Sequence, residues 1–318
     1  MVTRVGVVGL GLIGGSLLRR MQAANFRATG ASGWDTNAHT RIRAATAGLV
    51  VAESLEELAA VSEVLFVAVP MPDIGGVFAG ISGLVEPSSI VTDVTSVKQP
   101  VRDLAATHEF TFVGGHPMAG TEASGFAASD AELLAEAAWV LTIDEGTDLT
   151  AWLTLAGLIT SLGCRVIPCT SLEHDRAVAR VSHLPHILAA ALSIAAADDP
   201  LGMTLAAGSF RDATRVATTR PELIAAMCGG NSDALGPELS DFVARLQDAL
   251  FKLDQPDALA SWFAAAGAVR ANWPPVVTHR TDLPIDDKLA EQLLAAGRAG
   301  GQVTAVTTEH VVLRGPSA

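Results

Sequence analysis

Short apolar runs alternate with longer alanine- and leucine-rich segments through the first half of the chain. The short runs are rich in β-branched residues and lie at Val5 to Val8, Val64 to Val69, Ile90 to Val94, Phe110 to Val113, Val140 to Ile143 and Val166 to Ile167. Such alternation is typical of a parallel or mixed sheet covered by helices. The pattern predicts an α/β, Rossmann-type domain over residues 1–170.

The pattern changes after Pro168, where two long helices are predicted, Leu172 to Ala197 and Pro221 to Leu253. No convincing strand pattern occurs from there to Asn272, so we expect an all-α domain over residues 171–274. The run Leu184 to Ala197 is apolar nearly all round, and such a helix is buried in its own core or against a partner chain. We predict a homodimer formed through this domain.

The remaining residues, 275–318, follow the sequence Trp273-Pro274-Pro275 and are predicted to form a short C-terminal extension. Its pattern indicates a helix from Asp286 to Ala296 and a hairpin of Val303 to Thr307 with Val311 to Leu313. The role of this extension stays open between a docking arm and part of a small regulatory fold. Two domains fit a chain of 318 residues, because single hydrophobic cores stop growing near ~250 to 300 residues.

The acidic balance of the chain excludes some partners. A formal net charge of −13 repels nucleic acid and anionic membranes, so an anionic ligand needs a local basic pocket. The three cysteines lack the spacing of a disulfide framework or a zinc site. No secretory signal pattern is present and no apolar run reaches the ~18 to 20 residues of a membrane span, so we expect a cytoplasmic protein without a membrane partner.

A glycine motif, Gly9-Leu-Gly11-Leu12-Ile13-Gly14, follows the first predicted strand and opens a helix. In this context the first glycine permits a tight turn, the second lets the backbone approach a pyrophosphate, and the third allows close packing of helix on strand. The helix N-terminus offers free N–H groups to the phosphates. The motif therefore predicts a dinucleotide site at these six residues.

The choice of dinucleotide depends on the residues after the second predicted strand. Asp35 is placed to hold the adenine ribose, which favours NAD because a carboxylate repels the 2′-phosphate of NADP. Arg41 and Arg43 lie close enough in sequence to keep NADP possible. Val69 and Pro70, at the end of another strand, complete the predicted cofactor site.

Three polar stretches fall at predicted strand ends, where ligands bind in such sheets. They are Val69-Pro70, the segment Thr92-Asp-Val-Thr-Ser-Val-Lys98 and the segment Gly114-Gly-His-Pro-Met-Ala-Gly-Thr-Glu122. Together with Ser182-His-Leu-Pro-His186 and Gly208-Ser-Phe-Arg-Asp-Ala-Thr-Arg215, the set resembles the prephenate/arogenate dehydrogenase family of tyrosine biosynthesis. The resemblance covers roughly residues 4 to 273.

The resemblance implies oxidative decarboxylation of prephenate or arogenate to 4-hydroxyphenylpyruvate or tyrosine. Hydride leaves ring carbon C4 for the nicotinamide, the C4 hydroxyl loses its proton and the ring carboxylate departs as CO2. By resemblance His116 is the base, and a neutral histidine with an ordinary pKa of ~6.5 suits that task. Ser96 is the implied second hydrogen-bond partner of the hydroxyl.

The resemblance also implies residues that bind the substrate, whose two carboxylates need cationic or donor groups. They are Arg215, with Arg211 as a neighbour that could share its role, His186 and His183, and Thr121, Glu122 and Gly208. Glu122 could pair with Arg215 as a gate. Pro185, between the two histidines, indicates a helix start. No carboxylate or cysteine joins these histidines in a ligand motif, so no metal is predicted.

Two other functions remain as alternatives. β-Hydroxyacid dehydrogenases share this domain order but use a lysine base in the second domain, and the region from Ser171 to Phe251 contains no lysine. A non-catalytic dinucleotide sensor would leave His116, Ser96 and Arg215 unassigned. Within the family, the choice between prephenate and arogenate and any feedback by tyrosine stay open.

Overall fold

The computed structural model describes residues 2, 4–24, 30–121 and 123–316. A five-stranded parallel sheet forms the first layer, in the order β2-β1-β3-β4-β5. Its strands are β1 (Arg4–Val8), β2 (Gly30–Trp34), β3 (Val64–Val67), β4 (Ile90–Asp93) and β5 (Thr111–Val113). β2 lies next to β1 on one side and β3 lies next to it on the other, so the connections after β1 and after β3 run in opposite directions along the sheet. A crevice opens between the carboxyl ends of β1 and β3, where these connections diverge.

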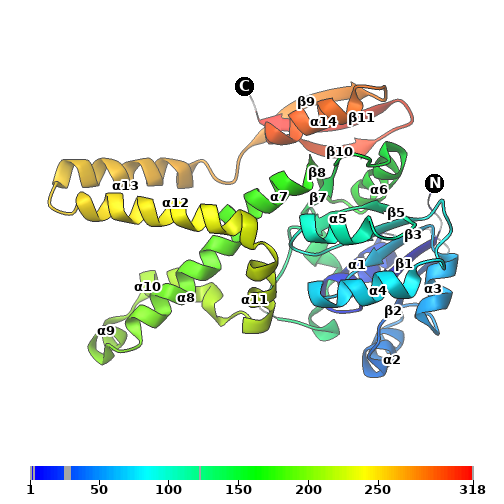
Figure 1. Ribbon diagram of the computed structural model, residues 1–318, viewed down its shortest axis with the longest axis horizontal. Helices are drawn as coiled ribbons and strands as arrows, with labels where there is room; N and C mark the ends of the chain where they lie inside the picture. The colour runs from blue at the N-terminus through cyan, green and yellow to red at the C-terminus, as the bar shows by residue number, and fades with distance from the viewer. Residues whose placement is uncertain (1, 3, 25–29, 122, 317–318) are drawn as a thin grey trace.

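Helices cover both faces of this sheet. One face packs against α3 (Leu55–Val61), α4 (Ile74–Ile81) and α5 (Gln99–Ala105), and Figure 1 shows α4 and α5 in front of the strands. The other face packs against α1 (Leu12–Ala23) and the elements that follow β5, while α2 (Ala38–Thr46) follows β2. Three 3₁₀ turns, Met71–Asp73, Phe126–Ala128 and Ala131–Leu134, connect these elements. The Rossmann-type fold predicted from the apolar pattern is confirmed.

A second, six-stranded sheet has the order β6-β7-β8-β10-β11-β9. Its first three strands are β6 (Gly115–Pro117), β7 (Ala138–Thr142) and β8 (Arg165–Cys169), with α6 (Leu149–Ser161) between β7 and β8. The other three, β9 (Val277–Pro284), β10 (Gln302–Val306) and β11 (His310–Pro316), come from the C-terminal extension together with α14 (Leu289–Arg298).

The predicted helix and hairpin of the extension are confirmed, and β9 is an additional strand that the sequence pattern did not reveal. β10 lies antiparallel to β8, with Val303 opposite Val166. Leu289, Leu293 and Val303 are completely buried in the same core as the first sheet. The extension is therefore built onto the nucleotide-binding region at the top of Figure 1.

The helical region begins with one continuous helix of 26 residues, Ser171–Ala196. It consists of α7 (Ser171–Val178), a π-helical turn (Ala179–His183) and α8 (Leu184–Ala196). The predicted long helix Leu172 to Ala197 is confirmed, and its second α-helical part, α8, begins at Leu184 with Pro185 in its first turn. The wider π turn ends at His183, two residues before Pro185. A proline at this place would otherwise disrupt the backbone hydrogen bonds of an α-helix.

The rest of the helical region extends away from the sheets (Figure 1). It contains α9 (Pro200–Leu205), α10 (Gly208–Thr214), a 3₁₀ turn (Arg215–Thr218), α11 (Pro221–Gly230), α12 (Ser232–Phe251) and α13 (Pro256–Ala271). The buried cluster of α8 and α12 is small, comprising Ala179, Leu184 and Leu235. Within the described residues, the apolar helix is therefore not buried in a core of its own domain, which was one of the two expected alternatives.

One expectation about hydropathy is wrong. Helix Ser171–Ala196 is long and apolar enough, by length and composition, to cross a membrane, and an 18-residue window within it has a mean hydropathy of 1.3. The difference arises because polar and charged residues interrupt the apolar run in the sequence, whereas the helix as a whole is long and apolar enough. Its N-terminal part carries His174 and Asp175, which are buried in polar contacts of the site described below.

Candidate active site

The glycine motif forms a turn between β1 and α1 in which each glycine has a separate steric reason. Gly9 has a positive φ of +91°, a conformation that side chains disfavour. A Cβ on Gly14 would lie 1.9 Å from the carbonyl oxygen of Gly9, whereas a Cβ on Gly11 would meet nothing within 4 Å. The backbone at Gly11 is thus open to a ligand, and Leu12 and Ile13 follow it in the first turn of α1.

The N-terminus of α1 has the chemistry of a phosphate site. Its N-cap residue, Gly11, has no side chain, so no side-chain cap takes up the first N–H groups of this 12-residue helix. These N–H groups and the positive end of the helix dipole suit the pyrophosphate of a dinucleotide. The residues therefore fit a nicotinamide dinucleotide, which would supply the hydride acceptor when bound.

Asp35 closes the other side of the glycine turn. One of its carboxylate oxygens accepts a hydrogen bond from the Leu10 N–H at 2.8 Å, and the other accepts one from the Asn37 N–H at 2.8 Å. Arg41 donates to the backbone carbonyls of Asp35 and Thr36, at 2.6 and 3.2 Å. Val69 and Pro70 follow β3 at the same edge of the sheet.

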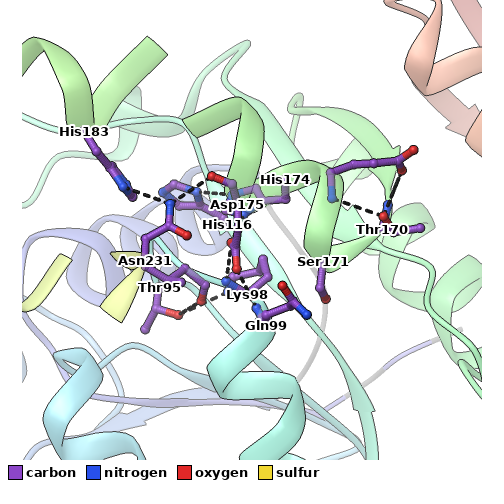
Figure 2. Close-up of polar contacts among 12 residues, drawn as sticks. Thr95, Lys98, Gln99, His116, Thr170, Ser171, His174, Asp175, His183 and Asn231 are labelled. Carbon is purple, nitrogen blue, oxygen red and sulfur yellow. Dashed lines mark hydrogen bonds and ion pairs between the residues drawn. The ribbon is translucent and has the colours of Figure 1, made fainter. Parts of the chain in front are cut away.

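His116 lies in β6, directly after the first sheet, and is joined to the start of the long helix (Figure 2). Its Nδ1 is 2.9 Å from Nε2 of His174, and Nδ1 of His174 is 2.7 Å from a carboxylate oxygen of Asp175. Both α7 residues are about 2% exposed. The motif-based prediction missed them, although an adjacent His-Asp pair in the first turn of the predicted helix Leu172 to Ala197 was a signal that could have indicated them.

A buried ion pair fixes the loop beneath His116. Lys98 and Asp93 have completely buried side chains and contact each other. The Lys98 ammonium also donates to the carbonyl oxygen of Gly115 at 2.5 Å and lies 3.2 Å from the Thr95 hydroxyl. Asp93 accepts the Gly115 N–H at 3.1 Å. Gly115, the residue just before His116, is thus held on its N–H by Asp93 at the end of β4 and on its carbonyl by Lys98 directly before α5.

The electrostatic surroundings keep His116 neutral. Burial is the main cause that lowers the pKa of His116 well below its ordinary value, and the charges associated with His174, Lys98 and His183 lower it further. A neutral imidazole carries a lone pair that can accept a proton. His116 therefore has the protonation state that a general base requires at neutral pH.

A second buried histidine lies near this group. Asn231, between α11 and α12, donates from its amide nitrogen to the backbone carbonyl of Asp175 at 2.8 Å and lies 3.0 Å from Nδ1 of His183. Because that nitrogen accepts, Nε2 of neutral His183 carries the proton. Within the described residues this buried Nε2 has no hydrogen-bond partner, so His183 offers a donor to a ligand.

The other predicted residues occupy several elements. Ser96 lies half-buried in the loop that Lys98 ties to Gly115, so that loop holds it close to the strand of His116. His186, on α8, has Nδ1 at 3.3 Å from the carbonyl oxygen of Val216. The remaining three are Gly208 at the start of α10, exposed Arg215 at the start of the 3₁₀ turn, and exposed Thr121 after β6.

Glu122, and with it the predicted gate to Arg215, lies outside the described residues. In the ranges that the structure covers, no group of three or more histidine, cysteine, aspartate or glutamate side chains is placed to hold a metal ion. The site geometry thus combines a dinucleotide turn, a neutral base and buried donors at the junction of the two domains.

Comparison with known proteins identifies the family of this chain. The chain matches the family model for the prephenate dehydrogenase nucleotide-binding domain over residues 19–168 and that for its dimerization domain over residues 170–264. A cyclohexadienyl dehydrogenase of Zymomonas mobilis is 32% identical over 255 residues, or 76% of this chain and 86% of that protein.

Two solved structures are similar over most of their length. A Corynebacterium glutamicum protein, provisionally named prephenate dehydrogenase, is 35% identical, with a TM-score of 0.83, and the match covers 94% of this chain and 98% of that one. Synechocystis arogenate dehydrogenase is 32% identical, with a TM-score of 0.75, over 85% of this chain and 99% of that one. The two family models, the sequence relative and the similar folds agree, and the chain belongs to the prephenate dehydrogenase family.

Proposed function

We propose that His116 is the base in an oxidative decarboxylation of prephenate or arogenate with NAD, which forms 4-hydroxyphenylpyruvate or tyrosine. The protein is a nicotinamide-dinucleotide-dependent dehydrogenase of tyrosine biosynthesis, as its family membership implies. The observation that carries the role of His116 is the position of its half-buried imidazole at the strand-end edge that holds the dinucleotide turn, where burial lowers its pKa. A neutral imidazole there can take a proton while a hydride leaves the same substrate.

The protein itself carries out little covalent chemistry in this reaction. The substrate hydroxyl gives its proton to His116, and the C1–carboxylate bond breaks to release CO2. A bound dinucleotide would accept the C4 hydrogen with its electron pair. The bonding electrons of that carboxylate enter the ring, which becomes a phenolate, and the proton held by His116 returns to this oxygen to give the phenol. The protein must therefore orient the hydroxyl toward His116 and hold the carboxylates, and Ser96 is proposed as the second hydrogen-bond partner of the hydroxyl.

Binding of the substrate carboxylates is assigned to groups of the helical region. A guanidinium pairs with a carboxylate through two parallel hydrogen bonds, which supports Arg215 in this role. The Nε2–H of His183 is a buried donor with no hydrogen-bond acceptor among the described residues. His186, three residues further along the helix and therefore on a neighbouring part of its surface, is proposed as a further donor. Gly208, Thr121 and Glu122 are proposed as further substrate-binding residues, of which Glu122 lies outside the described residues.

NAD is the proposed cofactor because the negative charge of Asp35 lies at the end of β2. A carboxylate at this position favours a ribose hydroxyl over a 2′-phosphate. Arg41, which could have bound such a phosphate, donates instead to two backbone carbonyls. We expect kcat/KM with NAD to exceed that with NADP by about tenfold or more, as one charge-assisted hydrogen bond provides.

A steady-state assay tests the proposal directly. Initial rates of dinucleotide reduction are measured with prephenate and with arogenate, each with NAD and with NADP. We expect turnover with at least one substrate, higher kcat/KM with NAD, and release of one CO2 per reduced dinucleotide. Bound dinucleotide without turnover in all four combinations would contradict the proposed activity and favour a dinucleotide sensor.

A homodimer is the proposed assembly. The helical region exposes large apolar side chains, among them Ile194 on α8, Leu205 on α9, Leu250 and Phe251 on α12, and Val269 on α13, each at least 68% exposed. Apolar surface of this extent on one region usually marks an interface. The family model matched here is that of a dimerization domain, which supports the same assembly.

A further inference from the structure

A row of three polar side chains leads from His116 into the protein. The first link joins the rings of His116 and His174, and the second joins His174 to the carboxylate of Asp175. The two rings stand nearly perpendicular, at 77°, so the ring nitrogens meet at an edge and the rings do not stack. Figure 2 shows this row above Lys98.

The position of each proton in this row follows from Asp175. Its carboxylate accepts the backbone N–H groups of Lys98 and Gln99, at 2.7 and 2.8 Å. An ionised carboxylate only accepts hydrogen bonds, so Nδ1 of His174 must donate to it. A neutral imidazole has one N–H, which leaves Nε2 of His174 as an acceptor. Nδ1 of His116 must then donate to His174, and the lone pair of His116 lies on Nε2.

The opposite arrangement would disable the base. A protonated His174 would donate from Nε2, and His116 would then carry its proton on the nitrogen that should accept one. Burial, the largest cause, lowers the pKa of His174, and the charge of Lys98 adds to it, while Asp175 and Asp93 act in the other direction. His183, Lys98 and His174 are the charged or titratable groups that face His116. The balance favours two neutral rings.

We infer that His174 and Asp175 are positioning residues that hold His116 with its proton on Nδ1 and its lone pair on Nε2, facing the substrate hydroxyl. This inference rests on the proposed function of His116. In the reaction the substrate O–H bond breaks and an Nε2–H bond forms on His116. The resulting imidazolium keeps its Nδ1–H bonded to His174, whose own N–H is polarised by the Asp175 carboxylate. The arrangement stabilises the positive charge that the base acquires, as in other carboxylate–histidine pairs.

Two substitutions at His174 separate acceptor chemistry from packing. His174→Leu removes the acceptor, whereas His174→Gln can present an amide oxygen to Nδ1 of His116. We expect the leucine variant to lose about 10²-fold in kcat, with KM changed by less than about threefold, because the interaction matters in the transition state. The glutamine variant should recover about tenfold of that loss. His310→Gln, at an exposed histidine on β11, is the matched control and should behave as wild type.

The spectroscopic readout needs no substrate. In protein labelled with ¹⁵N-histidine, NMR at pH 7 reports which nitrogen of His116 is protonated, with His116→Gln used to assign the signal. We expect Nδ1–H in wild type and in His174→Gln, and loss of this state in His174→Leu. Nε2–H in wild type, or a leucine variant that keeps more than about a third of wild-type kcat, would overturn the inference.

If the leucine variant does not fold, the wild-type spectrum alone tests the positioning role of His174 and Asp175. The outcome also separates this inference from the proposed function. Wild-type protein that shows Nδ1–H on His116 but turns over neither substrate contradicts the proposed function and supports the arrangement of His116. Wild-type protein that is active but shows Nε2–H supports the function and overturns the positioning role.

Discussion

At the scale of single residues, the site depends on histidines whose charge is suppressed by their surroundings. Burial lowers the pKa of His116 and of His174, and burial with the nearby His174 lowers the pKa of His183 to about 4. Buried neutral histidines are useful here because each offers one donor and one acceptor in a defined direction. The direction is set by carboxylate, amide and backbone partners.

The suppressed charge of His116 predicts the acid limb of the pH profile. The active form is neutral, and a lowered pKa means that activity persists as the pH falls below 6.5, the ordinary histidine value, and is lost only when the pH passes through the lowered pKa. The pH dependence of kcat/KM measures this pKa in the free enzyme. A half-maximal rate at or above pH 6.5 on the acid side would contradict the account.

The motifs predicted some of these residues and not others. The strand-end position of His116 and the helix position of His183 follow from local sequence. The partners of these residues do not, because Asp175 is 59 residues away from His116 along the chain and Asn231 is 48 residues away from His183. Such contacts depend on how the two domains pack, which periodicity and motif spacing do not describe.

At the scale of elements, the C-terminal extension supports the helix that carries the site. Arg298 at the end of α14 pairs with Glu173 at 2.5 Å, and Glu173 forms a capping box with Thr170 at the start of α7. Position 297 is a glycine because a Cβ there would lie 1.8 Å from the carbonyl oxygen of Pro168. The extension thus contacts β8 and the first turn of α7, at the residue directly before His174.

The helix and hairpin of this extension followed from the apolar pattern, whereas its attachment did not. β9 is mostly exposed and rich in polar residues, so it lacks the alternation that identifies a half-buried strand. The pairing of β10 with β8 joins residues 137 positions apart, Val303 and Val166. Local propensity contains no information about such a pairing.

A core substitution in α14 tests whether the extension is integral to the fold. Leu293 is completely buried, so Leu293→Ala removes packed methyl groups and leaves a cavity. We expect the free energy of unfolding to fall by about 2 to 5 kcal/mol, measured by urea denaturation. Glu291→Ala, at an exposed position on the same helix, is the control and should change stability by less than about 0.5 kcal/mol. Equal stabilities of the two variants would show that the extension is not part of the cooperative core.

At the scale of the whole molecule, the two halves differ in how they bury apolar surface. The nucleotide-binding region has two large cores, one on each face of its parallel sheet, and the extension adds to one of them. The helical region has a small core and exposes many large apolar side chains. The uneven distribution fits a chain whose helical half is completed by a second copy.

Charge substitutions test this assembly. Ile194→Asp on α8 places a carboxylate on a side chain that is 72% exposed in the single chain, and burial of an unpaired charge at an interface is costly. We expect the dissociation constant of the dimer to rise by at least about 10²-fold in sedimentation equilibrium. Val50→Asp, at a residue 65% exposed on the nucleotide-binding region, is the matched control. A monomeric wild-type protein, or equal effects of both substitutions, would contradict the proposed dimer.

The measurement that tests the central claim most directly is kcat of His116→Asn beside wild type, with substrate and dinucleotide at saturating concentrations. Asparagine is close to histidine in size but cannot take up a proton, so we expect kcat to fall by about 10²- to 10⁴-fold. Bound dinucleotide and the melting temperature should stay close to wild type, and His310→Asn should keep full activity. A His116→Asn variant within about tenfold of wild-type kcat would show that His116 is not the base.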